Sequence, residues 1–577
     1  MIEATFGSRR LQAQGLSTHF RSPLTVVTAT RHEDIYPLLL NAETAAQAGH
    51  WVALMLSYEA APAFDQVMKT REATEFPLAW AAVFATPFED SDPVEDQSYA
   101  VGTWKPLVNR ADFSESISQI REFIAAGDTY QVNYTFPLVT SFKGDARSWF
   151  RDLCRAQGAE YCAYFDLGRF QILSVSPELF FEQEGRTVRT RPMKGTIRRG
   201  RWAEEDLLMA NQLAASAKDR AENVMIVDLL RNDLGRVAEI GSVNVTRLFE
   251  LERYETLWQM TSTIEARLRA EVTFPELMAR LFPCGSITGA PKIRTMEIIR
   301  DLEPFPRGVY TGALGFLRPD GSAVFNVAIR TIVIDTHTGM ATFGVGGGIT
   351  YDSTAEREYE ECLVKSSFLT RKPAEFELLE TLRLEAGEFY LLARHLQRMK
   401  ASAEYFGFSF REKEILDELA RVCAQRRSGK WKVRLLVSRH GETHIETQEL
   451  DSLDRVLRVA LAREPININD RFLFHKTTNR KLYEDALASR PDCDDVILWN
   501  DSDEVTESTI ANLVVSIGGT LYTPPVHAGL LPGTLRAQLL EQGRIFERSI
   551  RRADLLAADE IFLLNSVRGW RPAVLVS

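Results

Sequence analysis

The chain is interrupted once by a short polar stretch with a proline, RKPAEF at residues 371–376, after which a new pattern of strands and helices begins. A length of 577 residues is also too great for one ordinary hydrophobic core. No internal repeat crosses the break. The sequence therefore predicts two domains, residues 1–370 and residues 371–577, the second about the size of one α/β-type domain.

The first half mixes strands and helices without a regular alternation. Residues 160–200 read as strands separated by turns, with a strand and then a loop at the end of this region. Apolar residues then recur with helical spacing over 216–232 and again over 355–368. This mixture predicts an α+β fold.

The composition excludes several classes of function. A net charge of -11, with 25% charged and 45% hydrophobic residues, describes a globular protein without a basic surface for nucleic acid or an anionic membrane. No apolar run is long enough to span a bilayer, and the N-terminal residues lack the apolar stretch of a signal peptide. We therefore expect a cytoplasmic protein. Its 6 cysteines show no metal-binding spacing, which favours buried thiols over disulfides or zinc.

A lysine and a glutamate stand out in the first half. Lys194 lies in RTRPMKGT, between a proline and a Gly-Thr pair, where a turn can aim a side chain into a cleft. Glu178, in SPELFF, lies 16 residues earlier, with a strand pair between them. If the two meet across a hairpin, they form either a salt bridge or an acid and an amine tuned for nucleophilic chemistry.

Other residues of the first half are candidates for ligand binding. Glu358 and Glu361 share one face of a predicted helix, and Glu222 lies on another, which fits either a Mg²⁺ site or a solvated charged face. The glycines at 346–348 follow a strand and either present N–H groups to a carboxylate or mark a bulge. Arg330 interrupts an apolar strand and needs an anionic partner, either a structural carboxylate or a ligand.

Seven motifs follow one another over residues 20–368: SPELFF, PMKGT, SAKDRAENVMIVDLLRNDLGRV, FPCGSITGAPKIRTMEII, YTGALGF, AIRT and GGGITYDSTAEREYEECLVK. In this order and spacing they resemble the chorismate-utilising enzymes. The resemblance implies a two-layer, chorismate-binding β-sandwich with flanking helices.

Two positions imply which reaction of this family the chain carries out. A lysine at position 194 is the mark of the aminodeoxychorismate-forming branch, whereas anthranilate synthases have a small residue there. Isochorismate and salicylate synthases have a water-activating lysine where this chain has Gln131. The resemblance thus implies amination of chorismate at C4, giving 4-amino-4-deoxychorismate. One departure is Gln259, where anthranilate synthases have a histidine, so any proton role of that histidine is absent here.

The same resemblance implies roles for individual residues. Lys194 would attack C2 while Glu178 protonates the leaving C4 hydroxyl. Mg²⁺ held by Glu222 and Glu361, with Glu358 nearby, would bind the ring carboxylate. Further substrate contacts would come from Thr288, Tyr310, Arg330, Gly346, Gly347 and Gly348. Because the chain has no glutaminase nucleophile motif, ammonia would come from a separate glutamine amidotransferase subunit or from solution.

The second half contains, in order, the segments LLETLRLEAGEFYLLARHLQRMKASAEYFGF, HKTTNR, EVTESTIANLVV, GLLPGTLR and ADEIFLLNSVRG. Together they resemble the fold-type IV pyridoxal-phosphate enzymes, which implies a smaller α+β domain. By this resemblance Lys476 would bind the cofactor, Glu507 would pair with its ring nitrogen, and Thr381 would assist Lys476. The phosphate would be held by Arg398, Thr534, Leu535 and Ser566.

Together the two halves predict a bifunctional enzyme that makes 4-aminobenzoate, a folate precursor, from chorismate. The first half would aminate chorismate and the second would eliminate pyruvate. Two alternatives stay open. One is an anthranilate synthase-type enzyme fused to a branched-chain or D-amino acid aminotransferase-like domain, and the other is a second half without catalytic activity. The resemblance also leaves open a homodimer formed through the second domain.

Overall fold

The computed structural model describes residues 2–7, 18–88, 97–370, 375–451 and 455–576, so most of the predicted break at 371–376 lies outside it. The chain divides into two compact units. The first consists of Met1–Arg198 and Ala210–Pro373, and the second of Arg199–Met209 and Ala374–Ser577. The second unit is therefore discontinuous in sequence, because a short segment from the middle of the first half belongs to it.

One sheet of the first unit runs in the order β16, β8, β20, β19, β10, β9, β1, β2, with β6 and β7 paired to β8. The long strand β8 is rich in β-branched and aromatic residues, which favour a pleated, half-buried surface. The strands are β1 (Glu3–Gly7), β2 (Thr18–Arg21), β6 (Tyr99–Val101), β7 (Lys105–Pro106), β8 (Gln131–Gly144), β9 (Tyr161–Asp166), β10 (Phe170–Ser176), β16 (Gly289–Ala290), β19 (Thr331–Asp335) and β20 (Met340–Ile349).

The other sheet of the first unit runs in the order β13, β15, β12, β11, β18, β17, β4, β5, β3, with β14 paired to β15. Its pairings are antiparallel, as in the first sheet. The strands are β3 (Thr25–Ala29), β4 (Trp51–Leu56), β5 (Ala79–Phe84), β11 (Leu179–Glu184), β12 (Thr187–Arg191), β13 (Met193–Arg198), β14 (Asn244–Arg253), β15 (Leu257–Arg267), β17 (Ala313–Leu317) and β18 (Ala323–Val327).

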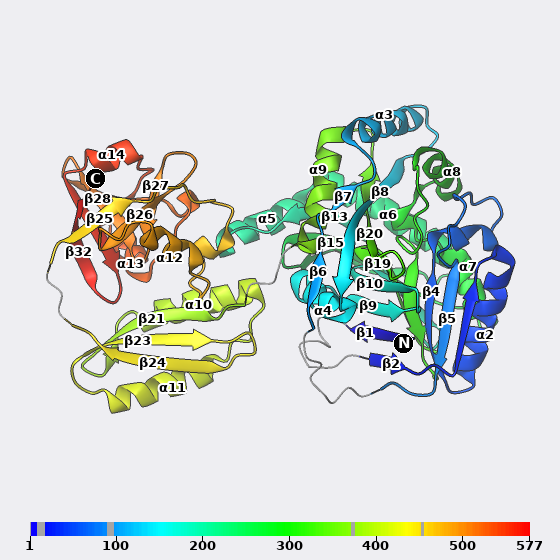
Figure 1. Cartoon of the computed structure of the whole chain (residues 1–577), viewed down its shortest axis with the longest axis horizontal. Helices are drawn as coiled ribbons and strands as arrows, with labels where there is room; N and C mark the ends of the chain where they lie inside the picture. Colours follow the sequence, from blue (N-terminus) through cyan, green and yellow to red (C-terminus); the bar gives the residue numbers. More distant parts are fainter. Residues whose placement is uncertain (1, 8–17, 89–96, 371–374, 452–454, 577) are drawn as a thin grey trace. The chain divides into compact units, whose positions relative to one another are not determined.

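The two sheets face each other across an apolar core. The rings of Phe165 on β9 and Trp80 on β5 meet edge to face, with their centroids 5.8 Å apart. The ring centroids of Phe6 on β1 and Phe316 on β17 are 4.7 Å apart. Separate clusters fill the outer sides, where helices cover each sheet; Figure 1 shows α2 beside β4 and β5. This arrangement confirms the predicted two-layer β-sandwich with flanking helices.

The helices of the first unit lie close to the predicted ranges. The helix expected over 216–232 is α6, capped by the Ser216 side chain, and the helix expected over 355–368 is α9. No helix in the described part of the chain is both long and apolar enough to cross a membrane. The helices are α2 (Ile35–Gln47), α3 (Arg110–Ala125), α4 (Ala146–Gln157), α6 (Ala217–Gly235), α7 (Phe274–Leu281), α8 (Lys292–Leu302) and α9 (Ala355–Ser366), while α5 (Ala203–Ala215) begins in the second unit and ends in the first.

The second unit contains two sheets with their own cores. The smaller sheet, in the order β22, β21, β23, β24, is covered by α10 and α11. The larger runs β27, β26, β25, β32, β31, β28, β29, β30, and β25 pairs in parallel with both β26 and β32. This agrees with the predicted second α+β domain. Its elements are β21 (Leu378–Glu385), β22 (Glu388–Phe389), α10 (Leu392–Phe406), α11 (Glu412–Gln425), β23 (Lys430–Val437), β24 (Thr443–Glu449), β25 (Leu457–Leu461), α12 (Lys481–Ala488), β26 (Asp495–Trp499), β27 (Val505–Ser508), β28 (Asn512–Ile517), β29 (Thr520–Thr523), α13 (Thr534–Glu541), β30 (Phe546–Glu547), α14 (Arg552–Leu556), β31 (Glu560–Asn565) and β32 (Gly569–Leu575).

Candidate active site

Lys194 lies on a bulge of β13. The pairing of β13 with β15 shifts register between Met193 and Thr196, which leaves Lys194 and Gly195 outside the regular ladder. Gly195 has a φ of 95°, and a Cβ atom there would lie only 2.9 Å from the Asp219 side chain. The sequence predicted that the strand ends in a loop here. Instead, β12 ends at Arg191 and a second strand, β13, begins at Met193 and carries Lys194 on its bulge.

Gln259 braces this bulge from the neighbouring strand. Its side-chain amide donates to the Gly195 carbonyl at 2.9 Å and accepts from the Thr196 hydroxyl, also at 2.9 Å. Gln259 thus holds both residues that follow Lys194, at the position where anthranilate synthases have a histidine.

Glu178 lies just before β11 and is 3% exposed. The Ser286 hydroxyl donates to its Oε1 atom at 2.6 Å. Burial raises the pKa of Glu178 to about 7, against the opposing effects of the Ser286 hydrogen bond and the positive charge of Lys194. The structure therefore brings Glu178 and Lys194 into one site, and it gives the carboxyl group a pKa at which it can donate a proton near neutral pH.

Three glutamates surround Lys194 without forming a closed metal cluster. The Lys194 Nζ atom lies 3.9 Å from Glu222 Oε2, and Glu361 pairs with Lys365 at 2.8 Å. Burial lowers the pKa of Lys194, and the charges of Glu222, Glu361 and Glu358 oppose this shift. Within the described ranges, no group of three or more His, Cys, Asp or Glu side chains is arranged to hold a metal ion. The two lysines, Lys194 and Lys365, offset part of the negative charge of the three carboxylates.

Gly348 makes the space in which Lys194 and Gln131 meet. A Cβ atom at Gly348 would lie 2.4 Å from Lys194 Nζ and 2.5 Å from Gln131 Nε2. Gly346, Gly347 and Gly348 were predicted to follow a strand, but they lie inside β20, paired with β8. The face that Gly346 and Gly348 share has no room for a side chain, since a Cβ atom at Gly346 would lie 2.3 Å from the Tyr134 carbonyl oxygen. On the opposite face, a Cβ atom at Gly347 would meet its nearest neighbour, Glu358 Oε2, at 3.4 Å.

The Gln131 side chain points to a ligand. Gln131 is completely buried, yet neither its Nε2 nor its Oε1 atom has a hydrogen-bond partner in the part of the chain that the structure describes. An unpaired buried polar group costs about 1–3 kcal/mol, and such groups are typical of functional sites. Because Gln131 adjoins Lys194 across Gly348, we expect a polar ligand at this point.

Arg330 and Thr288 differ in whether their side chains already have polar partners within the protein. Arg330 is half-buried, and no described carboxylate lies within ion-pair distance of it, which favours the ligand alternative over a structural carboxylate. Burial lowers its pKa to about 10. The Thr288 hydroxyl already donates to backbone carbonyl groups of Cys284 and Gly285, at 3.3 and 3.2 Å.

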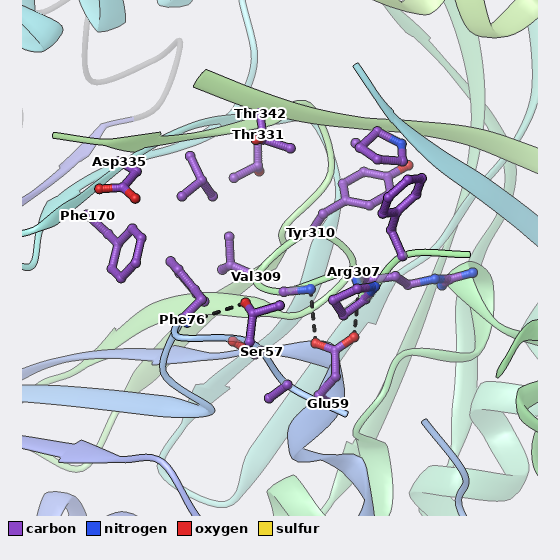
Figure 2. A pocket seen from close by; sticks show the side chains of 18 of the residues that line it. Ser57, Glu59, Phe76, Phe170, Arg307, Val309, Tyr310, Thr331, Asp335 and Thr342 are labelled. Atoms are coloured by element: carbon purple, nitrogen blue, oxygen red, sulfur yellow. Dashed lines mark hydrogen bonds between the residues drawn. The ribbon is translucent and has the colours of Figure 1, made fainter. Parts of the chain in front are cut away.

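Tyr310 lies between the Lys194 site and a neighbouring cavity. Its ring fills the position that a Cβ atom at Gly344 would take, on the same face of β20 as Gly346 and Gly348. Tyr310 and Gly344 also line a cavity of about 310 Å³ (Figure 2). There the buried Glu59 carboxylate accepts from the backbone N–H groups of Arg307 and Gly308, at 2.7 and 2.9 Å, and so fixes the loop that carries Tyr310.

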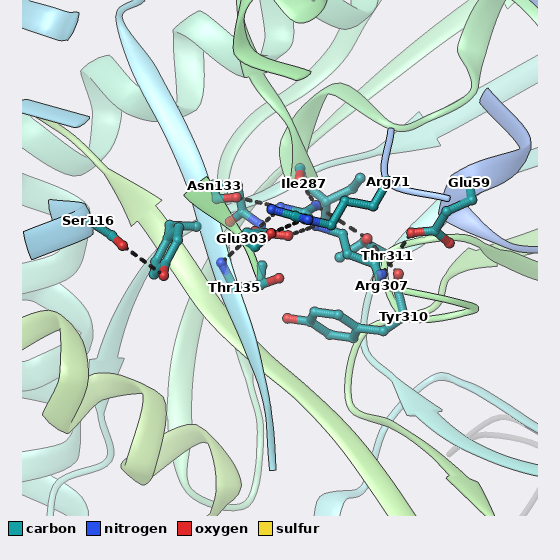
Figure 3. A network of polar contacts seen from close by, with 11 residues as sticks. Glu59, Arg71, Ser116, Asn133, Thr135, Ile287, Glu303, Arg307, Tyr310 and Thr311 are labelled. Carbon is teal, nitrogen blue, oxygen red and sulfur yellow. Dashed lines mark hydrogen bonds and ion pairs between the residues drawn. The ribbon is translucent and has the colours of Figure 1, made fainter. Parts of the chain in front are cut away.

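A buried ion pair ties this loop to the strand of Gln131. Arg307 donates to both carboxylate oxygens of Glu303, at 2.6 and 2.8 Å, and to the carbonyl groups of Asn133 and Ile287 (Figure 3). The Glu303 carboxylate also accepts from the Thr135 N–H group on β8 at 2.8 Å. The side chains of Glu303 and Arg307 are 4% and 2% exposed. Water therefore cannot stabilise either charge, and each depends on its partner in the ion pair.

We expect the variant Glu303→Gln to lower the free energy of unfolding of the first unit by about 3–5 kcal/mol, because it leaves the Arg307 charge buried and unpaired. Urea unfolding followed by tryptophan fluorescence would measure the change. Asp301→Asn is a matched control, since the Asp301–Arg300 pair on the same helix is exposed and contributes about 0–1 kcal/mol. Equal stability of the two variants would contradict the role of the buried pair.

In the second unit, the predicted cofactor residues surround one cavity of about 310 Å³. Lys476 lies in it, and burial, together with the charge of Arg398, lowers its pKa to about 8. A group of cationic residues that were not singled out in the sequence also lines this cavity. The predicted residues there are Thr381, Arg398, Lys476, Glu507, Thr534, Leu535 and Ser566, and the cationic ones are Lys432, Arg434, Arg480 and Arg568.

Glu507 and Arg398 are held by buried partners. The Glu507 carboxylate accepts from the Tyr483 hydroxyl at 2.9 Å and the Leu531 N–H group at 3.1 Å, and burial raises its pKa to about 7. Arg398 donates through two nitrogens to Glu380, at 2.8 and 2.7 Å, so its charge already has a carboxylate partner. The free N–H groups at the start of α13, near Thr534, form a ready anion site beside it.

Two residues of the first site were not singled out in the sequence. Ser286 stands inside the motif FPCGSITGAPK, but only the fold shows that it contacts Glu178. Lys365 pairs with Glu361 and donates to the Gly346 carbonyl at 3.0 Å. Its spacing of four residues from Glu361 on a predicted helix is a signal that could have found this pair.

The sequence profile of the chorismate binding enzymes matches residues 9–371, well over half of the chain. The chain therefore belongs to the chorismate binding enzyme family. The profile of the class IV amino-transferases matches residues 377–576, so a class IV aminotransferase domain follows the chorismate-binding domain.

Relatives of the first domain carry two different names. Aminodeoxychorismate synthase component 1 of Klebsiella aerogenes is 41% identical over 273 residues, covering 47% of this chain and 60% of the relative. Anthranilate synthase component 1 of Streptomyces coelicolor is 39% identical over 312 residues, covering 54% of this chain and 60% of the relative. The chain thus spans 60% of the length of each. The structure of anthranilate synthase component I from Streptococcus pneumoniae matches with a TM-score of 0.55 at 25% identity, covering 64% of this chain and 92% of that one.

Proposed function

We propose that the protein converts chorismate to 4-aminobenzoate in two steps, amination in the first unit and release of pyruvate in the second. The observation that carries the first step is the position of Lys194, whose buried amine meets the unpaired Gln131 amide above Gly348. Anthranilate synthases, which add ammonia at C2, have a small residue in place of this lysine. In this chain the lysine amine itself would attack C2.

In the first step the neutral Lys194 amine forms a bond to C2 of chorismate, both ring double bonds shift, and the C4–O bond breaks. Glu178 gives its proton to the departing hydroxyl, which leaves as water. Ammonia then bonds to C4 while the C2–Nζ bond breaks, which restores Lys194, and a proton from nitrogen returns to Glu178. The sum is chorismate plus ammonia giving 4-amino-4-deoxychorismate plus water. The covalent bond divides one displacement into two.

Glu222 and Glu361 have the donor chemistry for Mg²⁺, which takes one or two carboxylates together with water and substrate oxygens. Both carboxylates act on the charge of Lys194, as does Glu358, so all three face the same site. When bound, Mg²⁺ would supply positive charge for the ring carboxylate of the substrate. Arg330, without a carboxylate partner in the described residues, suits a second carboxylate.

The residues of the second unit fit pyridoxal phosphate, which supplies an electron sink when it is bound. The start of α13 fits the phosphate, and the Glu507 carboxyl group, with a pKa of about 7, fits the ring nitrogen. Lys476 would hold the cofactor and then move the proton that accompanies loss of pyruvate, since its pKa of about 8 suits proton transfer. Lys432, Arg434, Arg480 and Arg568 suit a substrate with carboxylate groups.

We infer that ammonia is delivered by a separate glutamine amidotransferase, as the name component 1 of the relatives implies a second component. Product analysis tests the whole proposal. Incubation with chorismate, Mg²⁺ and ammonia should give 4-amino-4-deoxychorismate, and addition of pyridoxal phosphate should give 4-aminobenzoate and pyruvate. Anthranilate as the main product would overturn the assignment of the first unit.

The amination rate is expected to fall as the pH rises through about 7, because Glu178 donates a proton only while it is protonated and burial raises its pKa to about 7. Ser286→Ala removes a hydrogen bond that stabilises the carboxylate, so it should raise the pKa of Glu178 and move this fall to higher pH by roughly half a unit to one unit. The check is kcat/KM for chorismate against pH at a constant concentration of free ammonia. An unmoved profile would exclude Glu178 as the proton donor.

A further inference from the structure

The segment Arg199–Met209 directly follows β13, the strand that carries Lys194, but it belongs to the second unit. Ion pairs within this segment fix its conformation. Arg199 pairs with Asp206 at 2.7 Å, and the Gly200 N–H group donates to the same carboxylate at 2.9 Å. Arg201 pairs with Glu205 at 3.0 Å. The segment therefore presents a fixed turn to the rest of the second unit.

Two aromatic contacts seat this turn in the core of the second unit. Trp202 stacks on Phe474 with ring centroids 4.9 Å apart, and it belongs to the apolar cluster around Phe474. The Arg199 guanidinium lies 4.3 Å from the centre of the Tyr405 ring, and the Tyr405 hydroxyl donates to the Gly200 carbonyl at 2.7 Å. Cation–π and stacked pairs in buried positions contribute on the order of 1 kcal/mol each.

The turn also holds His475, the residue before Lys476. The Nε2 atom of His475 lies 3.2 Å from the Arg201 carbonyl oxygen, and its Nδ1 atom lies 2.9 Å from the Ser402 hydroxyl. A carbonyl can only accept, so Nε2 carries the hydrogen and Nδ1 accepts from Ser402. Burial lowers the pKa of His475 to about 3, which keeps this neutral form in place at all physiological pH values. The ring is further packed against Tyr405, at 4.4 Å.

We propose that Arg199–Met209 is a positioning element for Lys476, so that the lysine site of the second unit is incomplete without a segment encoded inside the chorismate-binding domain. Phe474 and His475 are fixed by Trp202 and the Arg201 carbonyl, and the next residue is Lys476. On its other side, the Lys476 carbonyl accepts from the Leu379 N–H group at 3.0 Å. The backbone is thus held on both sides of the lysine that enters the cavity. The inference rests on the proposed cofactor role of Lys476.

The test uses the full-length chain with Trp202→Ala, Tyr405→Phe and, as a matched control, Leu207→Ala, whose side chain lies on the same segment but is exposed. Two readouts need no turnover: the Kd for pyridoxal phosphate by absorbance titration, and the midpoint of the pH profile for labelling of Lys476 by trinitrobenzenesulfonate, read by peptide mass spectrometry. Trp202→Ala should raise Kd about tenfold and move the labelling midpoint up by about one unit, toward that of an ordinary lysine. Leu207→Ala should change neither.

The outcomes distinguish the positioning role of Arg199–Met209 from the proposed cofactor role of the second unit. If the unaltered chain binds pyridoxal phosphate and both variants bind it with unchanged Kd and labelling midpoint, the positioning role is wrong. If the unaltered chain does not bind it, the proposed function of the second unit fails instead. Tyr405→Phe removes one oxygen atom and keeps the ring, so it covers the case in which Trp202→Ala fails to fold. We expect it to shift both readouts in the same direction by a smaller amount.

Discussion

Replacing Lys194 with alanine should reduce the formation of 4-amino-4-deoxychorismate by at least about a thousandfold. Alanine has no group that can bond to C2, and no other lysine replaces it, because Lys365 is engaged by Glu361 and the Gly346 carbonyl. The substitution also empties the space above Gly348, which opens C2 to ammonia. A small amount of anthranilate is therefore expected as a new product. Chromatography of reactions with chorismate, Mg²⁺ and ammonia would measure both compounds.

The control for this prediction is Lys143→Ala, which removes an exposed lysine at the end of β8. It should leave the rate unchanged. Circular dichroism of the Lys194→Ala variant would show that the loss does not come from unfolding. Full retained activity in that variant would rule out the nucleophile.

The second large effect is expected for Lys476→Ala. This variant should lose conversion of 4-amino-4-deoxychorismate to 4-aminobenzoate, again by about a thousandfold or more, and should lack the absorbance of lysine-bound pyridoxal phosphate. Amination of chorismate should be retained, because the predicted residues for that step lie in the first unit. Release of pyruvate, followed with a coupled dehydrogenase, would measure the loss.

Lys481→Ala provides a lysine control from the same stretch of chain. The Lys481 side chain is 81% exposed and forms an ion pair with Asp485, one turn further along the same helix. Its removal should affect neither the absorbance of the bound cofactor nor the release of pyruvate. Persistence of the cofactor absorbance in Lys476→Ala would show that another group binds pyridoxal phosphate.

Much of the fold could be predicted because the local sequence patterns favour the same helices and strands that the tertiary structure contains. The helices expected over 216–232 and 355–368 occur as α6 and α9, since their apolar spacing and their caps act within a few residues.

The candidate sites were less accessible to sequence reasoning. Lys194 and the glycines at 346–348 were placed in loops after strands, whereas both lie within strands. Glycine normally disfavours a strand, and here it is explained by close approach of distant atoms, such as Lys194 Nζ to Gly348. No local pattern carries that information. The same holds for Ser286, whose contact with Glu178 spans 108 residues of sequence.

The discontinuous second unit also determines the order in which the protein can be completed. During synthesis the N-terminal part folds first, and Trp202 leaves the ribosome long before Phe474 has been made. Tyr405, the other main contact of this segment, lies 205 residues beyond Gly200. Arg199–Met209 must therefore wait beside a nearly finished first unit until the second is translated. A gene divided at the unit boundary after residue 373 would give a C-terminal product that lacks Arg199–Met209, so we expect the two proposed activities not to separate there without loss.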